Sequence, residues 1–324
     1  MVKIAVIGCG KWGKNLVRNF ANLGSLATIC CENKQNIASL AEQFCILPSD
    51  YESIPKNESV EAVAIATHSH THADLTRKAL LHGKHVYVEK PIALNFTQAQ
   101  DLVSLAKKNK RLLMTGHLLQ YHPVYLTMKD HLRNQLIGPV RKIHARRLFM
   151  GRIRPTEDVI WDLLPHDLSM ILSILRRPTK NIQAYSSSTF GSCADTVEAV
   201  LTFDPDITAY VSASWSFPFK EQSLTVIGET GILIFDDTRP WAEKLIHIPL
   251  TLLREQEDLL LSPQEIRFLS VEPDEPLKQE CAHFIECIRQ GCEPRTGAKE
   301  FLPVIALCQN IQDYIGEKNH AYPA

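Results

Sequence analysis

The chain has 324 residues and a formal net charge of -1, from 35 Lys and Arg against 36 Asp and Glu, which argues against the basic footprint of a protein that binds nucleic acid or an anionic membrane. Its nine cysteines are an odd number without a C-x-x-C pair, so they predict reduced thiols rather than a disulfide framework or a zinc ribbon. The N-terminus has no signal-peptide layout and no apolar stretch is long enough to span a membrane, so we expect a cytoplasmic protein.

The region from residue 2 to about 116 predicts a parallel sheet. Short β-branched runs alternate there with amphipathic helical stretches, such as the face formed by Leu16, Phe20 and Leu23, and this alternation is typical of βαβ units. The expected strands span residues 2–7, 26–31, 60–67, 85–89 and 111–115, and the later helices span 71–81 and 97–108. We therefore assign residues 1–120 to one α/β domain.

The rest of the chain predicts a second domain, because the length exceeds what one core usually holds. Several strands follow one another with few helices between them, which indicates a mainly antiparallel α+β domain. The expected elements are helices 121–135 and 165–175, strands 140–149, 182–189, 197–203, 208–215, 224–227 and 232–235, an irregular segment 254–276, and helices 277–290 and 299–315. Residues 121–324 should carry a large open sheet, and the last two helices are candidates to pack back on the first domain.

A glycine-rich loop follows the first expected strand and opens a helix, with the sequence Gly8-Cys9-Gly10-Lys11-Trp12-Gly13. In this position a G-x-G-x-x-G match predicts a Rossmann dinucleotide site, since Gly8, Gly10 and Gly13 permit the tight turn, the close approach of a pyrophosphate and the helix packing. Lys11 and Trp12 belong to the same expected site. The alternative is a tight turn without a ligand.

Glu32 stands at the end of the second expected strand, where an acidic residue would hydrogen-bond the adenosine ribose. Its carboxylate would repel a 2′-phosphate, so NAD is expected over NADP. The positive charge of Lys34, two residues on, could reduce this repulsion. The alternative for Glu32 is a solvated loop acid.

Three alternating histidines follow the third expected strand, in the run Thr67-His68-Ser69-His70-Thr71-His72. Thr67 and His72 are expected to line the nicotinamide side of the cofactor groove. A zinc or binuclear site would need further ligands, and a hydrolase barrel would need eight β/α repeats. We therefore expect no metal, and a metal-dependent hydrolase remains a third alternative.

The triplet Glu89-Lys90-Pro91 ends the fourth expected strand. Proline disfavours helix at the residue before it, so Lys90 is held extended at the carboxyl edge of the sheet, where ligands bind. Glu89 and Lys90 are therefore assigned to the cofactor site, and the Lys90 amine is a candidate catalytic group.

The run Trp161 to Asp167 precedes a helix whose first turn holds Pro165. His166 then lies at a helix N-terminus, where partial positive charge favours a neutral ring that can accept a proton. Asp162 is placed to orient that ring or to contact a hydroxyl. The alternative, a capping Asp and a surface His, is equally compatible with the spacing.

Four arginines lie within nine residues just before Trp161, and of these Arg147 and Arg154 are taken as ligands for a substrate pyrophosphate. Tyr121, His122 and Trp161 are taken as contacts for the rest of the substrate. A solvated basic loop and simple packing are the alternatives.

Together, the glycine-rich loop with Glu32, the triplet with Lys90, and Asp162 with His166 resemble the Gfo/Idh/MocA oxidoreductase family over nearly the whole chain. The resemblance implies a Rossmann domain, a C-terminal domain whose open sheet often forms the oligomer interface, and an active site lined by Lys90, Asp162 and His166. It therefore implies an NAD-dependent enzyme that forms a homo-oligomer, either a dimer or a tetramer.

Within the family, the runs 116–123, 161–167 and 217–222 are similar to those of nucleotide-sugar 3-dehydrogenases. This implies a UDP-sugar oxidised at its C3 hydroxyl, first UDP-N-acetylglucosamine and second its uronate, with a PLP-dependent aminotransferase as pathway partner for a 3-amino sugar of the lipid A type. The uronate enzymes usually have an asparagine in a run that reads Asp162-Leu163-Leu164-Pro165 here. A competing class is a non-catalytic NAD-binding regulator, which would need neither Lys90 nor His166.

Overall fold

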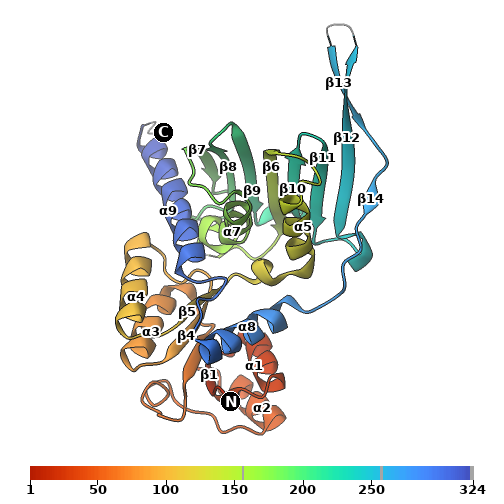
Figure 1. The fold of residues 1–324 in the computed structure, drawn as a ribbon. Coiled ribbons are helices and arrows are strands. Elements are labelled where there is room, and N and C mark those ends of the chain that lie inside the picture. Colours follow the sequence, from red (N-terminus) through yellow and green to blue (C-terminus); the bar gives the residue numbers. More distant parts are fainter. Residues whose placement is uncertain (155–156, 256–257, 322–324) are drawn as a thin grey trace. The chain divides into compact units, whose positions relative to one another are not determined.

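The computed structural model describes residues 1–154, 157–255 and 258–321 (Figure 1). The chain divides into two compact units. The first combines Met1–Tyr121 with Glu275–Ala306, and the second combines His122–Asp274 with Leu307–Ala324. A segment near the C-terminus thus belongs to the first unit before the chain ends in the second.

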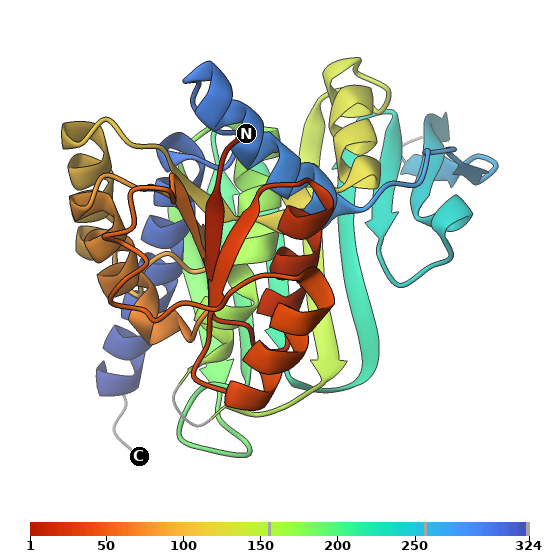
Figure 2. The ribbon, with the colours of Figure 1, turned by 90° about the horizontal axis from the view of Figure 1, so that it is seen from below.

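The first unit is built on a parallel sheet of the order β2-β1-β3-β4-β5 (Figure 2). Its strands are β1 (Ile4–Ile7), β2 (Leu26–Cys30), β3 (Ala62–Ile65), β4 (His85–Glu89) and β5 (Leu113–Gly116). Every residue of β1, β3 and β5 is buried, as expected for strands covered on both faces. The chain reverses its direction of travel across the sheet between β1 and β3, and such a switch point is where nucleotides bind. The predicted Rossmann sheet is confirmed.

The helices of this unit are α1 (Gly13–Asn22), α2 (Lys34–Phe44), α3 (Ser69–Leu81), α4 (Phe96–Lys108), η1 (Leu118–Tyr121), α8 (Pro276–Gln290) and the beginning of α9 (Ala298–Ala321). Helix α1 packs against α8, and α3 packs against α4. Phe20, Tyr87 and Phe284 meet edge to face, with ring centroids 5.8 to 6.5 Å apart. Helix α8 belongs to this unit because its apolar face completes the core around β1 and β4.

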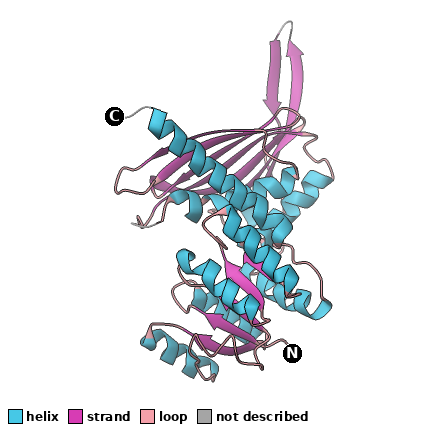
Figure 3. Ribbon diagram, turned by 90° about the vertical axis from the view of Figure 1, so that its left-hand side faces the viewer, coloured by secondary structure: helices cyan, strands magenta, loops and turns pink. Residues whose placement is uncertain are grey.

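The second unit contains a large, mostly antiparallel sheet of the order β13-β12-β11-β10-β6-β9-β8-β7, with β14 paired to β12 (Figure 3). Its strands are β6 (Val140–Met150), β7 (Asn181–Ser187), β8 (Thr196–Phe203), β9 (Ile207–Ser214), β10 (Ser216–Gly228), β11 (Gly231–Asp236), β12 (Leu245–Glu255), β13 (Asp258–Pro263) and β14 (Arg267–Phe268). Strands β6 and β9 run parallel and the other pairs are antiparallel. The expected open sheet is confirmed.

Helices cover one face of this sheet. They are α5 (Pro123–Arg133), α6 (Val159–Asp162) and α7 (Leu164–Leu175), and Figure 1 shows α5 and α7 over the strands that they contact. Burial alternates along β8 and β9, so successive side chains face the helices and the opposite side in turn. Among the described helices of the chain, none combines the length and apolar character needed to cross a bilayer.

The predicted irregular segment 254–276 is wrong at its beginning. Strand β12 pairs with β13 from Leu250 opposite Pro263 to Glu255 opposite Asp258, so the region forms a hairpin. The leucines on both strands favour this pairing, whereas the acidic residues that suggested a loop lie near its end. Residues 264–275 are irregular apart from the short strand β14.

Candidate cofactor and active site

The glycine-rich loop leaves open space where a pyrophosphate would lie. A Cβ on Gly8, whose φ is +93°, would come within 2.5 Å of the Ala66 carbonyl oxygen, and one on Gly13 would come within 1.9 Å of the Gly8 carbonyl oxygen. A Cβ on Gly10 would meet no atom within 4 Å. Gly8 and Gly13 are therefore needed for the turn and the helix packing, while Gly10 keeps room for a ligand.

The N-terminus of α1 faces this space without a side-chain cap at Trp12. The first N–H groups of a helix lack partners within the helix and carry partial positive charge, so they suit an anion. Glu32 is exposed two residues after β2, which lies beside β1. These residues fit a dinucleotide whose pyrophosphate lies on α1 and whose adenosine lies toward β2.

His72 is buried and connects two loops at the carboxyl edge of the sheet. Its Nδ1 lies 2.8 Å from the Pro91 carbonyl oxygen, and its Nε2 lies 3.2 Å from the Thr67 carbonyl oxygen. The side chain is only 2% exposed, and its predicted contact with the cofactor stays a prediction. The imidazole positions the backbone at Thr67 and Pro91.

Glu89 also points into the first unit. Trp12 Nε1 donates a hydrogen bond of 2.6 Å to Glu89 Oε1, and the Glu89 residue is 9% exposed. Burial raises the pKa of this carboxyl, while the hydrogen bonds from Trp12 and Tyr87 lower it. The Glu89 carboxylate holds Trp12 of the glycine-rich loop, and the assignment of Glu89 to the cofactor site stays a prediction. Lys90, the next residue, is half-buried at the end of β4.

A second buried carboxyl group lies behind Glu89. The Tyr87 hydroxyl oxygen is 3.0 Å from Glu89 Oε1 and 3.0 Å from Glu280 Oε2, and Glu280 is 0% exposed. The hydroxyl has one hydrogen and can donate it to one carboxylate only. Burial and the nearby Glu89 raise the pKa of Glu280 well above its usual value, which favours the protonated form of this carboxyl group.

Gly116 makes room for this network. A Cβ at Gly116 would lie 2.6 Å from the Tyr87 hydroxyl oxygen and 2.9 Å from Glu89 Oε2. The sequence pattern alone did not assign Tyr87, Gly116 or Glu280 to the site. One signal was present, since Glu280 shares a helix face with the buried Leu277, Cys281 and Phe284.

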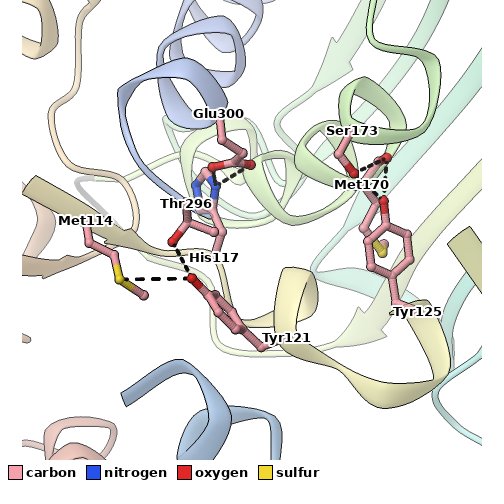
Figure 4. A network of polar contacts seen from close by, with 8 residues as sticks. All are labelled: Met114, His117, Tyr121, Tyr125, Met170, Ser173, Thr296 and Glu300. Atoms are coloured by element: carbon pink, nitrogen blue, oxygen red, sulfur yellow. Dashed lines mark hydrogen bonds and ion pairs between the residues drawn. The ribbon is translucent and has the colours of Figure 1, made fainter. Parts of the chain in front are cut away.

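His117 follows β5 directly and pairs with Glu300 of α9 (Figure 4). Its Nδ1 lies 2.7 Å and 2.9 Å from the two carboxylate oxygens. The sequence did not predict this pair, because nothing in the local pattern links residues 183 positions apart.

In the second unit, Asp162 is the last residue of α6 and His166 lies in the first turn of α7. Trp215 Nε1 donates a hydrogen bond of 3.2 Å to Asp162 Oδ2, and Arg154 Nη2 lies 3.4 Å from Asp162 Oδ1. Arg154 also pairs with Glu157, and its side chain is 46% exposed. Arg154 and Asp162 thus lie together, and Asp162 is four residues before the half-buried His166 in the sequence.

Arg147 is not available to a substrate. Its Nε and Nη2 donate hydrogen bonds of 3.0 and 2.8 Å to the two carboxylate oxygens of Asp167, and both side chains are buried. The predicted substrate contact is therefore wrong. The pair instead joins β6 to α7, next to His166 in the sequence.

Three residues predicted to contact the substrate are buried in the structure, and their substrate contacts stay predictions. The Tyr121 hydroxyl lies 3.2 Å from Thr296 Oγ1, and the whole residue is 2% exposed. His122 Nδ1 accepts from the Val124 N–H and caps α5, while its ring packs on Phe235 and Trp241. Trp161 is buried, and its Nε1 donates a hydrogen bond of 3.1 Å to Gln312. Their polar and aromatic groups make buried hydrogen bonds and packing contacts. The spacing of residues in the sequence does not reveal these contacts.

Two family models match the chain. Residues 2–117 match the model described as an oxidoreductase family with an NAD-binding Rossmann fold, and residues 125–234 match the Gfo/Idh/MocA C-terminal domain. The chain belongs to the Gfo/Idh/MocA oxidoreductase family.

Relatives within the Gfo/Idh/MocA family differ in what they act on. The chain is 28% identical to a UDP-N-acetylglucosamine 3-dehydrogenase of Acidithiobacillus ferrooxidans over 215 residues, 66% of this chain and 67% of that protein. It is 26% identical to a 2,7-anhydro-N-acetylneuraminate hydratase of Escherichia coli over 257 residues, 73% of this chain and 68% of that protein. A solved structure of the Acidithiobacillus ferrooxidans 3-dehydrogenase superposes with a TM-score of 0.82 at 22% identity and covers 97% of both chains, which shows the fold.

The cofactor of this Gfo/Idh/MocA protein is NAD, bound by the Rossmann sheet of the first unit. The groups placed for it there are the open Gly10, the uncapped N-terminus of α1 and the exposed Glu32. Within the described residues no group of three or more His, Cys, Asp or Glu side chains is arranged to hold a metal ion.

Proposed function

We propose that this oxidoreductase oxidises the C3 hydroxyl of a UDP-sugar with NAD, and that UDP-N-acetylglucosamine is the substrate. The observation that carries the proposal is the half-exposed Arg154, which lies 3.4 Å from Asp162 and shortly before His166. A guanidinium group at this place suits a phosphate oxygen. The 28% identity to a UDP-N-acetylglucosamine 3-dehydrogenase supports the same substrate.

In this mechanism NAD supplies the hydride acceptor. His166 accepts the proton of the C3 hydroxyl, or Lys90 accepts it or stabilises the alkoxide that develops. Asp162 is held by Trp215 and orients the substrate or the His166 ring. The Arg147 and Asp167 pair keeps α7 on β6, so that His166 stays in place.

The second candidate is another sugar or polyol dehydrogenase of the same family, such as one for the uronate or for inositol. An inositol 2-dehydrogenase of Salmonella typhimurium is 24% identical over 193 residues, 57% of each protein. A non-catalytic NAD-binding regulator is the alternative of another class. The sequence retains both Lys90 and His166, and this favours an enzyme.

The proposal includes a homo-oligomer and a pathway enzyme that uses the product. The uncovered face of the large sheet, with Tyr210 stacked on His144, is suited to join copies into a dimer or a tetramer. The 3-keto product would be consumed by a PLP-dependent aminotransferase that makes a 3-amino sugar.

The experiment is a substrate panel with the purified protein, NAD and absorbance at the NADH band. The panel contains UDP-N-acetylglucosamine, its uronate, UDP-N-acetylgalactosamine and myo-inositol. We expect reduction of NAD with UDP-N-acetylglucosamine, and less with the C4 epimer. If NAD is reduced only with inositol or only with the uronate, the proposed substrate is wrong. If NAD binds but no compound in the panel reduces it, the result favours the non-catalytic regulator.

A further inference from the structure

Two cysteines meet at the C-terminal end of α8. Gly291 follows the helix with a left-handed φ of 65°, and the Cys292 N–H donates a hydrogen bond of 3.2 Å to the Cys287 carbonyl oxygen. A bond from the residue after the left-handed glycine back to the last turn is typical of a Schellman motif. In this motif the two bonded residues usually bring apolar side chains into contact, and here both residues are cysteines.

The thiols of these two cysteines are hydrogen-bonded to each other. Cys287 is buried, with its Sγ 3.4 Å from His283 Nε2, whereas Cys292 is exposed. Because both the backbones and the thiols are in contact, a disulfide bond can join the pair without a large movement of the chain.

The two thiols differ in reactivity. Burial is the main cause that raises the pKa of the Cys287 thiol to about 12, and the hydrogen bond with Cys292 and the charge of that residue raise it as well. A protonated thiol reacts slowly with a disulfide, so the exposed Cys292 is the group that reacts first. Once Cys292 is capped in a mixed disulfide, it carries neither a hydrogen nor a charge, and two of the causes that keep Cys287 protonated are removed.

We propose that Cys287 and Cys292 form a modification site for low-molecular-weight disulfides such as oxidised glutathione. The Cys292 thiolate attacks one sulfur of the reagent, its S–S bond breaks, and one glutathione leaves as a thiol. The Cys287 thiolate then attacks Cys292 Sγ, the second glutathione leaves as a thiol, and a disulfide joins the two cysteines. The protein thiols lose two electrons and two protons in total, and the reagent takes up both.

The disulfide would join α8 to the next segment in the position that this segment already has. Arg295 Nη1 donates a hydrogen bond of 2.8 Å to the Gln120 carbonyl oxygen, and the Thr296 carbonyl accepts from the Thr115 N–H at 3.0 Å. Both bonds can stay in place when the disulfide forms, so NAD binding should be unchanged. The site does not depend on which sugar is oxidised.

Cys45 is the matched control inside the same chain. All nine cysteines lie in the described residues, and of these Cys45 and Cys292 are exposed. Each follows the C-terminal end of a helix, since Cys45 comes directly after α2. Within the described part of the chain, Cys45 Sγ has the Glu42 carbonyl oxygen at 3.8 Å as its hydrogen-bond partner and no second thiol beside it. An adduct on Cys45 should therefore persist.

The experiment is incubation of the purified protein with oxidised glutathione, alkylation of the remaining thiols, digestion with trypsin and mass spectrometry. We expect glutathione on Cys45 and a disulfide between the peptides 279–289 and 290–295. Because a neighbouring thiol acts at a high effective concentration, Cys292 should retain about tenfold less glutathione than Cys45. Dithiothreitol should remove the link between the peptides.

Three substitutions assign the steps. In Cys287→Ser, glutathione on Cys292 should rise to the level on Cys45. In Cys292→Ser, Cys287 should stay unmodified because it is buried. Cys281→Ser should keep the link, which shows that the other cysteine of peptide 279–289 has no part in it. Thermal unfolding establishes that each variant is folded before it is treated.

Three results would overturn the proposal. One is glutathione that persists on wild-type Cys292 at the level on Cys45, without a link between the peptides. Another is a wild-type Cys292 that carries neither glutathione nor a link while Cys45 is modified. The third is a link that survives in Cys287→Ser. The first two need no variant, so the proposal stays testable if Cys287→Ser does not fold.

Discussion

Trp12 Nε1 donates a hydrogen bond of 2.6 Å to Glu89 Oε1, so the glycine-rich loop is tied to the strand that carries Lys90. The bond joins the part of the first unit that binds the pyrophosphate to the part that is proposed to act on the substrate. A substitution at Trp12 or at Glu89 should therefore alter the position of the other residue and, with it, the binding of NAD.

Trp12→Phe keeps the aromatic ring and removes this donor. Hydrogen bonds to charged groups contribute about 1.5–3 kcal/mol, and we expect the lower end because Trp12 is 41% exposed. NAD binding should weaken by about tenfold at a free-energy cost of that size. Fluorescence titration with NADH measures the change, and an affinity equal to that of the wild-type protein would contradict the coupling.

Glu280→Gln tests the buried proton. Burial raises the pKa of Glu280 in the folded protein above its value of about 4.3 in the unfolded chain. The folded state therefore binds the proton more tightly, and the contribution of Glu280 to stability is complete below pH 4.3 and decreases as pH rises toward the folded pKa. The decrease is at most about 1.4 kcal/mol per pH unit for one group.

The glutamine amide can donate to the Tyr87 oxygen as the protonated acid does, and it does not titrate. The unfolding temperature of Glu280→Gln, measured by calorimetry from pH 5 to pH 9, should thus fall less with rising pH than that of the wild-type protein. The same pH dependence in both proteins would show that Glu280 is already ionised at the lowest pH tested.

Local rules were enough to predict the parallel sheet and the roles of Gly8 and Gly13, because a tight turn and a close helix packing depend on neighbours in the sequence. They failed for Arg147, whose partner Asp167 is brought close only when β6 and α7 pack together. His117 and Glu280 were missed for the same reason, since their partners come from distant segments. A polar residue at the edge of the sheet where a ligand is expected therefore does not by itself indicate a ligand contact. Its buried hydrogen-bond partners must also be known.

Arg147→Met should destabilise the second unit strongly. It leaves the Asp167 carboxylate buried without its bidentate partner, which typically costs about 3–5 kcal/mol. The double variant Arg147→Met with Asp167→Leu should recover most of this loss. Arg146→Met is the matched control, because Arg146 pairs with Glu221 on the surface and such pairs contribute at most about 1 kcal/mol. Urea unfolding of the wild-type protein, Arg147→Met, Asp167→Leu, the double variant and the control measures the coupling, and additive effects of the two changes would contradict it.

Glu32→Ser should weaken the preference for NAD over NADP. The exposed carboxylate lies where it would repel a 2′-phosphate, and a unit charge at 4 Å in water contributes about 1 kcal/mol, or roughly fivefold in affinity. The ratio of the two dissociation constants should change by about this factor through tighter binding of NADP. A loss of affinity for both cofactors without a change in their ratio would mean that Glu32 supports only the fold of the loop.

Lys90→Met and His166→Asn test the proposed proton transfer. Each group lies at the end of an element, Lys90 directly after β4 and His166 in the first turn of α7. Loss of a general acid or base typically lowers kcat by about 10²–10⁴. We expect this loss in both variants, measured with the sugar that reduces NAD in the panel, and an NAD dissociation constant close to that of the wild-type protein. Lys107→Met removes an exposed lysine from the end of α4 and should keep full kcat, so it controls for the change in charge. If only one of the two variants loses activity, that residue takes the proton or stabilises the alkoxide, and the other has no part in the chemical step.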